Sequence, residues 1–231
     1  KGRLQFRVWI TGTGDGSVWI QEPAESAETL KARLTRYLIA DDVEVSNQTG
    51  KWSLVHFTGP APEAPKGVTV RDAVRFGIPG TDWWVPEGTD AAFPESFPRL
   101  DGDELEAFRI ARGIPAWGRE LSEGLLPPEA GLDATDISYQ KGCYIGQEVI
   151  SRIKSAGKVN RRLVRLTFDA AAPVAGLSLI DAEGNAAGEL TSVSPLADGD
   201  LRHALAYVKR GAGEVLVISA DGSRYPAKIS A

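Results

Sequence analysis

One string in the middle of the chain combines a cysteine, a lysine and glycines at a spacing that could do chemistry. It covers residues 141–148 and reads Lys-Gly-Cys-Tyr-Ile-Gly-Gln-Glu. A helix is predicted near 145–155, so Cys143 should lie just before the helix N-terminus, where free N–H groups and the helix dipole stabilise a thiolate. Lys141 or Arg152 could add Coulomb stabilisation. The string therefore predicts a reactive thiol, ionised near neutral pH.

The same residues also have a purely structural explanation. Free cysteine often behaves as a small buried hydrophobe, with Gly142 and Gly146 simply serving the turn. Gln147 and Glu148 fall in the first helical turn, where an acidic side chain interacts favourably with the dipole. Residue types and spacing alone leave both interpretations of the cysteine open.

The string resembles the hallmark of the YgfZ-type folate-binding proteins, Lys-Gly-Cys-(Phe/Tyr)-x-Gly-Gln-Glu, at every specified position. Upstream, residues 109–115, 118–120 and 127–132 are similar to the run that precedes this motif in that family and in the related glycine-cleavage T-proteins, the aminomethyltransferases. Downstream, four segments are similar to the barrel domain of both families: 161–166, 188–192, 194–195 and 204–208. The resemblance covers most of the chain and is strongest over 105–208.

This resemblance implies a tetrahydrofolate-binding accessory protein for assembly or repair of iron–sulfur clusters, including those of tRNA-modifying enzymes. The implied cofactor is tetrahydrofolate or a one-carbon derivative, and the implied partners are iron–sulfur proteins or their assembly machinery. Two alternatives stay open: a folate-dependent aminomethyltransferase of the glycine cleavage type, and a scaffold that acts through protein contacts with a structural Cys143. Ala111 stands where the aminomethyltransferases carry the glutamate that reads the pterin ring, which favours an accessory factor over a transferase.

The resemblance also implies a set of site residues. Cys143 with Lys141 is the expected catalytic pair. A folate pocket needs apolar walls for the pterin, a polar group for its guanidine-like edge and cations for its glutamate tail. The candidates are Trp117, Glu120, Arg152 and Arg161. Each also suits a structural role, as core filler for the tryptophan and as a paired or solvated charge for the others.

No metal site is expected from this chain alone. His56 alternates with Trp52 and Leu54 on a predicted strand, and His203 begins another strand. Neither histidine has a second ligand at metal spacing. The single cysteine excludes an internal disulfide and a multi-cysteine cluster site.

The hydrophobic patterning predicts an α+β fold with two domains. Residues 1–157 mix the two periodicities and should form an aminomethyltransferase-like folate-binding domain of split β-α-β modules. Its expected elements, in chain order, are strands at 4–10 and 17–21, a helix ending near 40, a hairpin of 43–45 with 52–56, loops at 59–67 and 87–100 around a strand at 83–85, and helices from 103 and near 145–155. Family members usually carry a further segment before the part resembling residues 1–4, so this domain is expected to be N-terminally incomplete.

Residues 160–231 change to short period-two segments separated by turns. The expected strands are 162–168, 177–181, 186–193, 203–208, 214–219 and 224–229. Six short strands with almost no helix are typical of a small antiparallel β-barrel. The domain boundary is therefore expected near 157–160.

Composition limits the partners. The 231 residues include 26 Lys and Arg against 31 Asp and Glu, so the formal charge is −5. This balance gives no general electrostatic reason to bind nucleic acid, although a local basic patch remains open. No apolar run reaches the length of a membrane span. We expect a cytoplasmic protein with no direct nucleic-acid or membrane partner.

Overall fold

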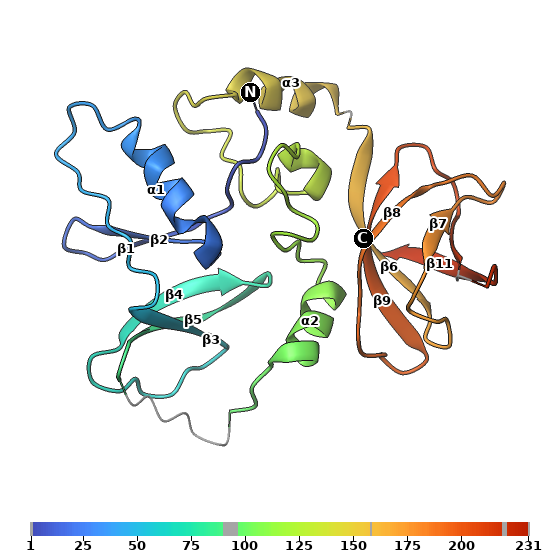
Figure 1. The fold of residues 1–231 in the computed structure, drawn as a ribbon, viewed down its shortest axis with the longest axis horizontal. Coiled ribbons are helices and arrows are strands. Elements are labelled where there is room, and N and C mark those ends of the chain that lie inside the picture. Colours follow the sequence, from blue (N-terminus) through green and yellow to red (C-terminus); the bar gives the residue numbers. More distant parts are fainter. Residues whose placement is uncertain (1, 90–96, 158, 219–220, 231) are drawn as a thin grey trace. The chain divides into compact units, whose positions relative to one another are not determined.

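The computed structural model describes residues 2–89, 97–157, 159–218 and 221–230. Its contacts divide the chain into two compact units. Residues 6–99 form the sheet unit, and residues 1–5 with 100–231 form the barrel unit (Figure 1). The chain passes from one unit to the other near residues 5 and 99. The functional domain boundary expected near 157–160 is a different boundary and stays a prediction.

The sheet unit begins with the predicted hairpin and helix. β1 (Trp9–Gly12) pairs antiparallel with β2 (Val18–Gln21), and the carboxylate of Asp15 closes the connecting loop by accepting from the Ser17 N–H at 2.9 Å. A short 3-10 turn (Ala24–Ser26) leads into α1 (Ala27–Thr35). The second strand and the helix lie where the sequence predicted them, although the helix ends at Thr35 and not near 40, and no residue of it is fully buried. The strand predicted at 4–10 is wrong over residues 4–8, because Leu4 belongs to the barrel unit, where it pairs with residues 124 and 125, and the first strand begins only at Trp9.

A three-stranded antiparallel sheet follows, with the order β3-β5-β4. Its strands are β3 (Trp52–Thr58), β4 (Thr69–Arg75) and β5 (Ile78–Pro86). The predicted hairpin of 43–45 with 52–56 is wrong, because β3 pairs with β5 and residues 43–45 form no strand. The reason is burial: β5 contributes Trp83 and Val85 to an apolar cluster, whereas Val43 is exposed. The predicted loop at 59–67 is confirmed, and part of the loop predicted at 87–100 lies outside the described residues.

The two faces of this sheet differ because side chains alternate along a strand. One face carries the apolar cluster of Phe57, Trp83 and Val85. The other carries buried Asp82, which accepts hydrogen bonds from Arg75 Nε at 2.8 Å and Nη2 at 2.7 Å, and pairs with His56 Nδ1 at 2.8 Å. Burial alone would raise the pKa of Asp82, but the hydrogen bonds from Arg75 and His56 outweigh it and lower that pKa.

The barrel unit contains both helices predicted for this part of the chain. α2 (Gly102–Ala111) and α3 (Gln147–Ala156) flank a turn-rich stretch with a 3-10 helix over Pro127–Ala130. Leu4 pairs with this stretch, donating its N–H to Leu125 O at 2.7 Å and accepting from Gly124 N–H at 2.8 Å. The first residues of the chain therefore fold with its second half.

All six predicted barrel strands are confirmed. They are β6 (Arg161–Asp169), β7 (Ser178–Ile180), β8 (Gly188–Val193), β9 (Leu201–Lys209), β10 (Val215–Ile218) and β11 (Arg224–Ser230). They form one antiparallel sheet in the order β7-β10-β11-β6-β9-β8. The two end strands approach each other, since Ala187 N–H donates to Leu179 O at 3.0 Å. The sheet is thus a nearly closed barrel.

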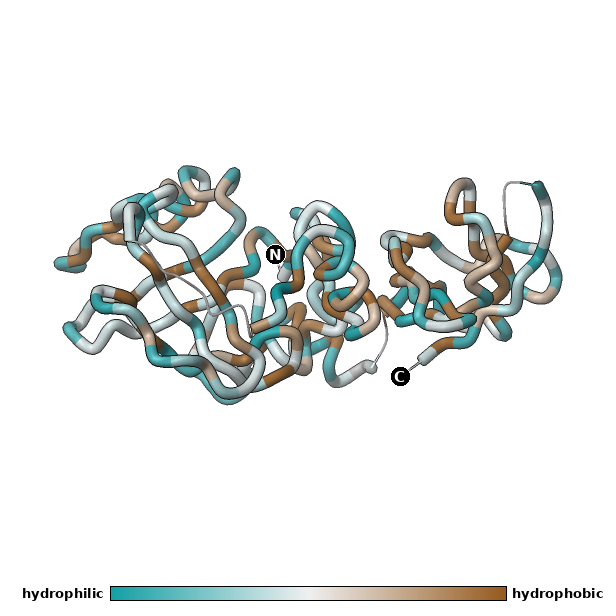
Figure 2. Tube along the Cα trace, turned by 90° about the horizontal axis from the view of Figure 1, so that it is seen from below, coloured by the Kyte–Doolittle hydropathy of each residue, from teal (hydrophilic) through white to brown (hydrophobic). Residues whose placement is uncertain are grey.

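The inside of the barrel is filled by apolar side chains, among them Leu166, Phe168 and Val217. Figure 2 shows hydrophobic and hydrophilic residues interspersed along the chain. α2 is tied to the barrel at its C-terminal end, where Arg165 Nη1 donates to Ala111 O at 2.8 Å. No helix in the described part of the chain is long and apolar enough to cross a membrane.

Candidate functional site

The 141–148 string forms the turn that starts α3. Gly146 precedes the first helical residue with φ of 92°, a left-handed conformation that favours glycine. Its carbonyl accepts from the N–H groups of Val149 at 3.1 Å and Ile150 at 3.2 Å. Ile150 is buried and anchors the helix. Cys143 lies four residues before Gln147, the first residue of α3, and is exposed. The stabilisation of its thiolate by the helix N-terminus stays a prediction.

Two lysines and two tyrosines surround this cysteine in the sequence, and we call the five residues Tyr139, Lys141, Cys143, Tyr144 and Lys154 the motif cluster. Lys141 Nζ lies 5.0 Å from the ring centroid of Tyr144, and Lys154 Nζ lies 3.5 Å from that of Tyr139. A cation over an aromatic face is attracted by the ring quadrupole. The cluster therefore pairs each ammonium group with a ring.

The tyrosine hydroxyls of the motif cluster are shielded from water. Neither the Tyr139 nor the Tyr144 hydroxyl has a hydrogen-bond partner among the described residues. Burial raises the pKa of Tyr139, with further contributions from the charge of Asp133 and from Tyr144. The Tyr139 phenol is therefore a neutral donor at neutral pH.

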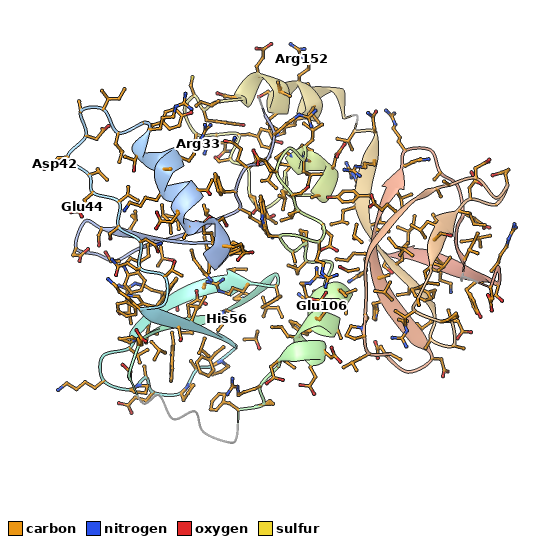
Figure 3. All side chains as sticks on the ribbon, viewed as in Figure 1. Arg33, Asp42, Glu44, His56, Glu106 and Arg152 are labelled. Carbon is orange, nitrogen blue, oxygen red and sulfur yellow. The ribbon has the colours of Figure 1, made fainter. Side chains whose placement is uncertain are left out.

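Arg152 lies on the outer face of α3 and projects away from it (Figure 3). It donates to Glu148 Oε1 at 2.7 Å, and both side chains are exposed. The described contacts of Arg152 are with this helix neighbour and include none with Cys143. Lys141 thus contacts Tyr144 within the motif turn, whereas Arg152 forms an exposed i,i+4 ion pair with Glu148.

Glu120 is at the centre of a buried polar network. Its Oε2 accepts from Arg109 Nη1 at 2.9 Å and from Ala116 N–H at 3.0 Å, and its Oε1 accepts from Ser192 Oγ at 2.5 Å. Arg109 Nη2 also donates to Ser192 Oγ at 2.9 Å. The network joins α2, the 116–121 turn and β8. Every oxygen of this carboxylate is thus used inside the fold.

Arg161 and Trp117 also have partners within the barrel unit. Arg161 Nε donates to Glu129 Oε2 at 3.1 Å, and its guanidinium carbon lies 4.3 Å from the ring centroid of Tyr207. The Tyr207 hydroxyl donates to Glu120 O at 2.9 Å, and burial raises the pKa of this phenol to about 12. Trp117 packs on the neighbouring apolar cluster. Tyr207 therefore contacts both predicted residues, the backbone carbonyl of Glu120 through its hydroxyl and the guanidinium of Arg161 through its ring, whereas the described contacts of Arg152 are with Glu148.

Sequence reasoning missed four residues of these two arrangements. Arg109 and Ser192 lie in the quoted family segments, but nothing in their spacing marked them as partners of Glu120. Tyr139 and Lys154 flank the motif, and an aromatic residue two positions before it was the available signal.

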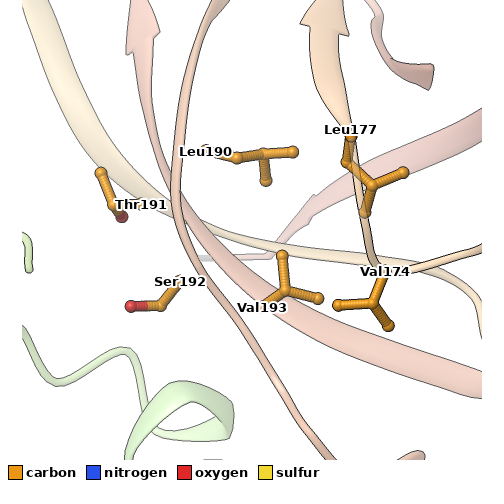
Figure 4. Close-up of a pocket in the computed structure, with 7 residues that line it drawn as sticks. Val174, Leu177, Leu190, Thr191, Ser192 and Val193 are labelled. Atoms are coloured by element: carbon orange, nitrogen blue, oxygen red, sulfur yellow. The ribbon is translucent and has the colours of Figure 1, made fainter. Parts of the chain in front are cut away.

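Metal-ligand sets and cavities are the other features that could mark a site. Over residues 2–89, 97–157, 159–218 and 221–230, no three His, Cys, Asp or Glu side chains gather as a metal-ligand set. A pocket of about 200 Å³ opens on the barrel wall beside the β8 bulge at Thr191, between Val174, Leu177, Leu190 and Val193 (Figure 4). It is smaller than the ~300–1,000 Å³ usual for ligand sites.

Comparison with known proteins relates the chain to two kinds of protein. No family model matches it. It is 33% identical to the mitochondrial iron–sulfur cluster assembly factor IBA57 of Mus musculus, over 82% of this chain and 58% of the mouse protein. It is 30% identical to the aminomethyltransferase of Staphylococcus saprophyticus, over 54% of this chain and 35% of that protein. The chain thus spans less than two thirds of either relative.

A solved structure supports the fold. The glycine cleavage system aminomethyltransferase T of Bartonella henselae superposes with a TM-score of 0.57 and 21% identity, over 72% of this chain and 49% of that one. The aminomethyltransferase fold predicted from the sequence is therefore confirmed. The split β-α-β arrangement of its first domain stays a prediction.

Proposed function

Because the chain is homologous to IBA57 assembly factors and to aminomethyltransferases, as the YgfZ and T-protein resemblance predicted, we propose that it is a folate-linked accessory protein in iron–sulfur cluster assembly or repair. The observation that carries this proposal is the complete 141–148 motif, whose only thiol is exposed on the turn before α3. Its clients would be iron–sulfur proteins or their assembly machinery, tRNA-modifying enzymes among them.

The geometry around Cys143 supports contact with another macromolecule. The thiol is exposed, and a Cβ added at the neighbouring Gly142 would meet no atom within 4 Å. Residues 141–143 are all exposed, so this part of the turn is accessible to a partner. In this proposal Cys143 is the reactive group, and Lys141 supplies a positive charge on the same turn.

Replacing the thiol tests the proposal most directly. In a strain that lacks the endogenous protein, Cys143→Ala and Cys143→Ser should restore cluster-dependent enzyme activities poorly, whereas Ser138→Ala, an exposed change in the same region, should restore them fully. A cluster-independent enzyme in the same extracts is the control for general fitness. Undiminished rescue by Cys143→Ala would favour the scaffold alternative, in which the cysteine is structural.

Folate binding is the finer part of the proposal and rests on the family resemblance. The predicted pocket residues fit it poorly as they lie: both oxygens of Glu120 and the guanidinium of Arg161 are engaged inside the barrel unit. A pterin would have to compete with Arg109 and Ser192 for the carboxylate. Calorimetry with tetrahydrofolate tests this part, and absence of binding to the complete gene product would remove the cofactor from the proposal.

An aminomethyltransferase is the second candidate, favoured by the staphylococcal relative and the shared fold. Ala111 speaks against it, since the resemblance places the pterin-reading glutamate at that position. Incubation with an aminomethylated lipoyl carrier protein and tetrahydrofolate separates the two candidates. Formation of methylene-tetrahydrofolate would favour the transferase.

Location and domain organisation complete the proposal. We keep a cytoplasmic location and a functional division into a folate-binding part over 1–157 and a barrel over 160–231. The mouse relative is named as mitochondrial. Cell fractionation tests the first point, and limited proteolysis with cleavage confined to 157–160 or to the 6–99 boundary tests the second.

A further inference from the structure

We propose that the motif cluster binds an oxyanion, a carboxylate or phosphate group. The starting observation is an imbalance of donors and acceptors. The side chains of Lys141 and Lys154 and the hydroxyls of Tyr139 and Tyr144 all present N–H or O–H groups. In the described part of the chain, these ammonium groups contact aromatic rings and form no ion pair.

The two hydroxyls make this imbalance costly. Each is shielded from water and has no partner among the described residues. A buried polar group without a hydrogen bond carries a desolvation penalty, so such groups in a native fold call for an unseen partner. A single water could satisfy one hydroxyl. Two phenols beside two cations instead favour a ligand that accepts several hydrogen bonds and carries negative charge.

The surrounding charge agrees with this ligand class. The chain is acidic overall, but the turn and α3 carry Lys141, Arg152 and Lys154. Glu148 is already paired with Arg152. The carboxylate of Asp133 raises the pKa of Tyr139 through its charge, but it forms no hydrogen bond with the Tyr139 hydroxyl. The cluster is thus a local basic patch whose two hydroxyls have no hydrogen-bonded acceptor among the described residues.

This assignment differs from the tail-binding role predicted for Arg152 and Arg161. Those guanidinium groups are engaged by Glu148 and Glu129, whereas the two lysines are free of carboxylates in the structure as described. The glutamate tail of a folate would supply a carboxylate of the required kind. The inference stands without folate, because simple anions can test it.

In the experiment, the 231-residue chain is titrated at low ionic strength with inorganic phosphate and, separately, with a tetraglutamate peptide. The readout is the NMR chemical shifts of the backbone amides of residues 139–148. Tetraglutamine is the neutral control peptide. We expect saturable shifts with at least one anion and none with tetraglutamine. Displacement of phosphate by tetraglutamate would identify the site as one for carboxylate chains, and phosphate binding alone as one for small oxyanions. No saturation at millimolar anion, or equal binding of tetraglutamine, would overturn the inference.

Variants locate the site. The double change Lys141→Gln/Lys154→Gln should weaken anion binding about tenfold or more, because two charge-assisted contacts are lost. Lys51→Gln/Lys66→Gln removes the same charge from exposed lysines of the sheet unit and should change the affinity less than about twofold, the part due to net charge.

Tyrosine changes separate ligand binding from a structural role. Tyr139→Phe/Tyr144→Phe keeps both rings and removes only the two unpartnered hydroxyls with their desolvation penalty, so the thermal midpoint of the free protein should stay the same or rise while the anion affinity falls severalfold. Unchanged anion affinity in both double variants would overturn the assignment. Since no assay here contains tetrahydrofolate or a cluster client, the result is independent of the rescue experiment on Cys143.

Discussion

Two polar regions of the barrel unit use the same kinds of side chain in opposite ways. In the network around Glu120, the guanidinium of Arg109 and the hydroxyl of Ser192 meet carboxylate oxygens, and all are buried. In the motif cluster, lysines and tyrosines lie together without an acceptor. A saturated buried network fixes one arrangement of the chain, whereas donors that lack an acceptor are available for a partner. The first region therefore holds the fold, and the second is where a ligand is expected.

The largest effect should come from breaking the saturated network. Among the described residues, Glu120→Ala leaves the buried Arg109 charge with Glu106 as its acidic partner, so we expect a loss of about 3–5 kcal/mol in the free energy of unfolding. Urea denaturation measures it. Glu123→Ala, an exposed change three residues away, should stay within about 0.5 kcal/mol. A small effect of Glu120→Ala would mean that the carboxylate is dispensable for folding and free to serve a ligand.

The sheet unit offers the same kind of saturated group with a titration that can be followed. The pKa of Asp82 is lowered in the folded state, so its contribution is complete above the unfolded carboxyl value of ~3.9 and is lost as the pH falls through the folded value. Asp82→Asn should lower the free energy of unfolding by about 2 kcal/mol at neutral pH.

The difference between this variant and the wild type should shrink below about pH 4. Unfolding curves at neutral pH and at about pH 3 test it. Asp72→Asn, on the exposed side of β4, is the matched control and should show no such trend. A difference that stays constant down to acid pH would contradict the assigned role of the Asp82 charge.

Within the motif, the two glycines should respond differently. Gly146 adopts φ of 92° before α3, a conformation that costs a side-chain-bearing residue about 1–2 kcal/mol, so Gly146→Ala should destabilise the barrel unit by that amount. Gly142 has no contact that a Cβ would disturb and no left-handed φ, so Gly142→Ala should change stability by less than about 0.5 kcal/mol. Thermal unfolding of both variants measures the difference. Equal destabilisation would show that the turn before Cys143 is also strained.

The elements were largely predictable because their signals are local. The six barrel strands follow from period-two segments between turns, and α2 ends where Gly113 and Pro115 predict. The failure at 43–45 has a long-range cause. The partner of β3 is set by burial of Trp83 on β5, some thirty residues along the chain, and β4 was missed because its alternating charged and small residues give a weak strand signal.

The site was predictable only in its position. The motif located Cys143 before a helix. Spacing could not show that the Glu120 carboxylate is hydrogen-bonded by Arg109 and by Ser192, because these contacts are made only in the folded chain. A buried ion pair and a ligand-binding carboxylate need the same residue type. Only the tertiary contacts separate them.

The smallest effect concerns Arg152, which the sequence proposed for the folate tail and the structure pairs with Glu148 on the outer face of α3. An exposed i,i+4 pair contributes about 0.3–0.5 kcal/mol. A double-mutant cycle with Glu148→Gln and Arg152→Gln should recover a coupling energy of that size in the free energy of unfolding, and high salt should reduce it.

The same variants should leave tetraglutamate binding nearly unchanged, because we place the anion at Lys141 and Lys154. A marked loss of binding in Arg152→Gln with the two lysines intact would instead place the anion at Arg152, the residue predicted from the sequence for the folate tail.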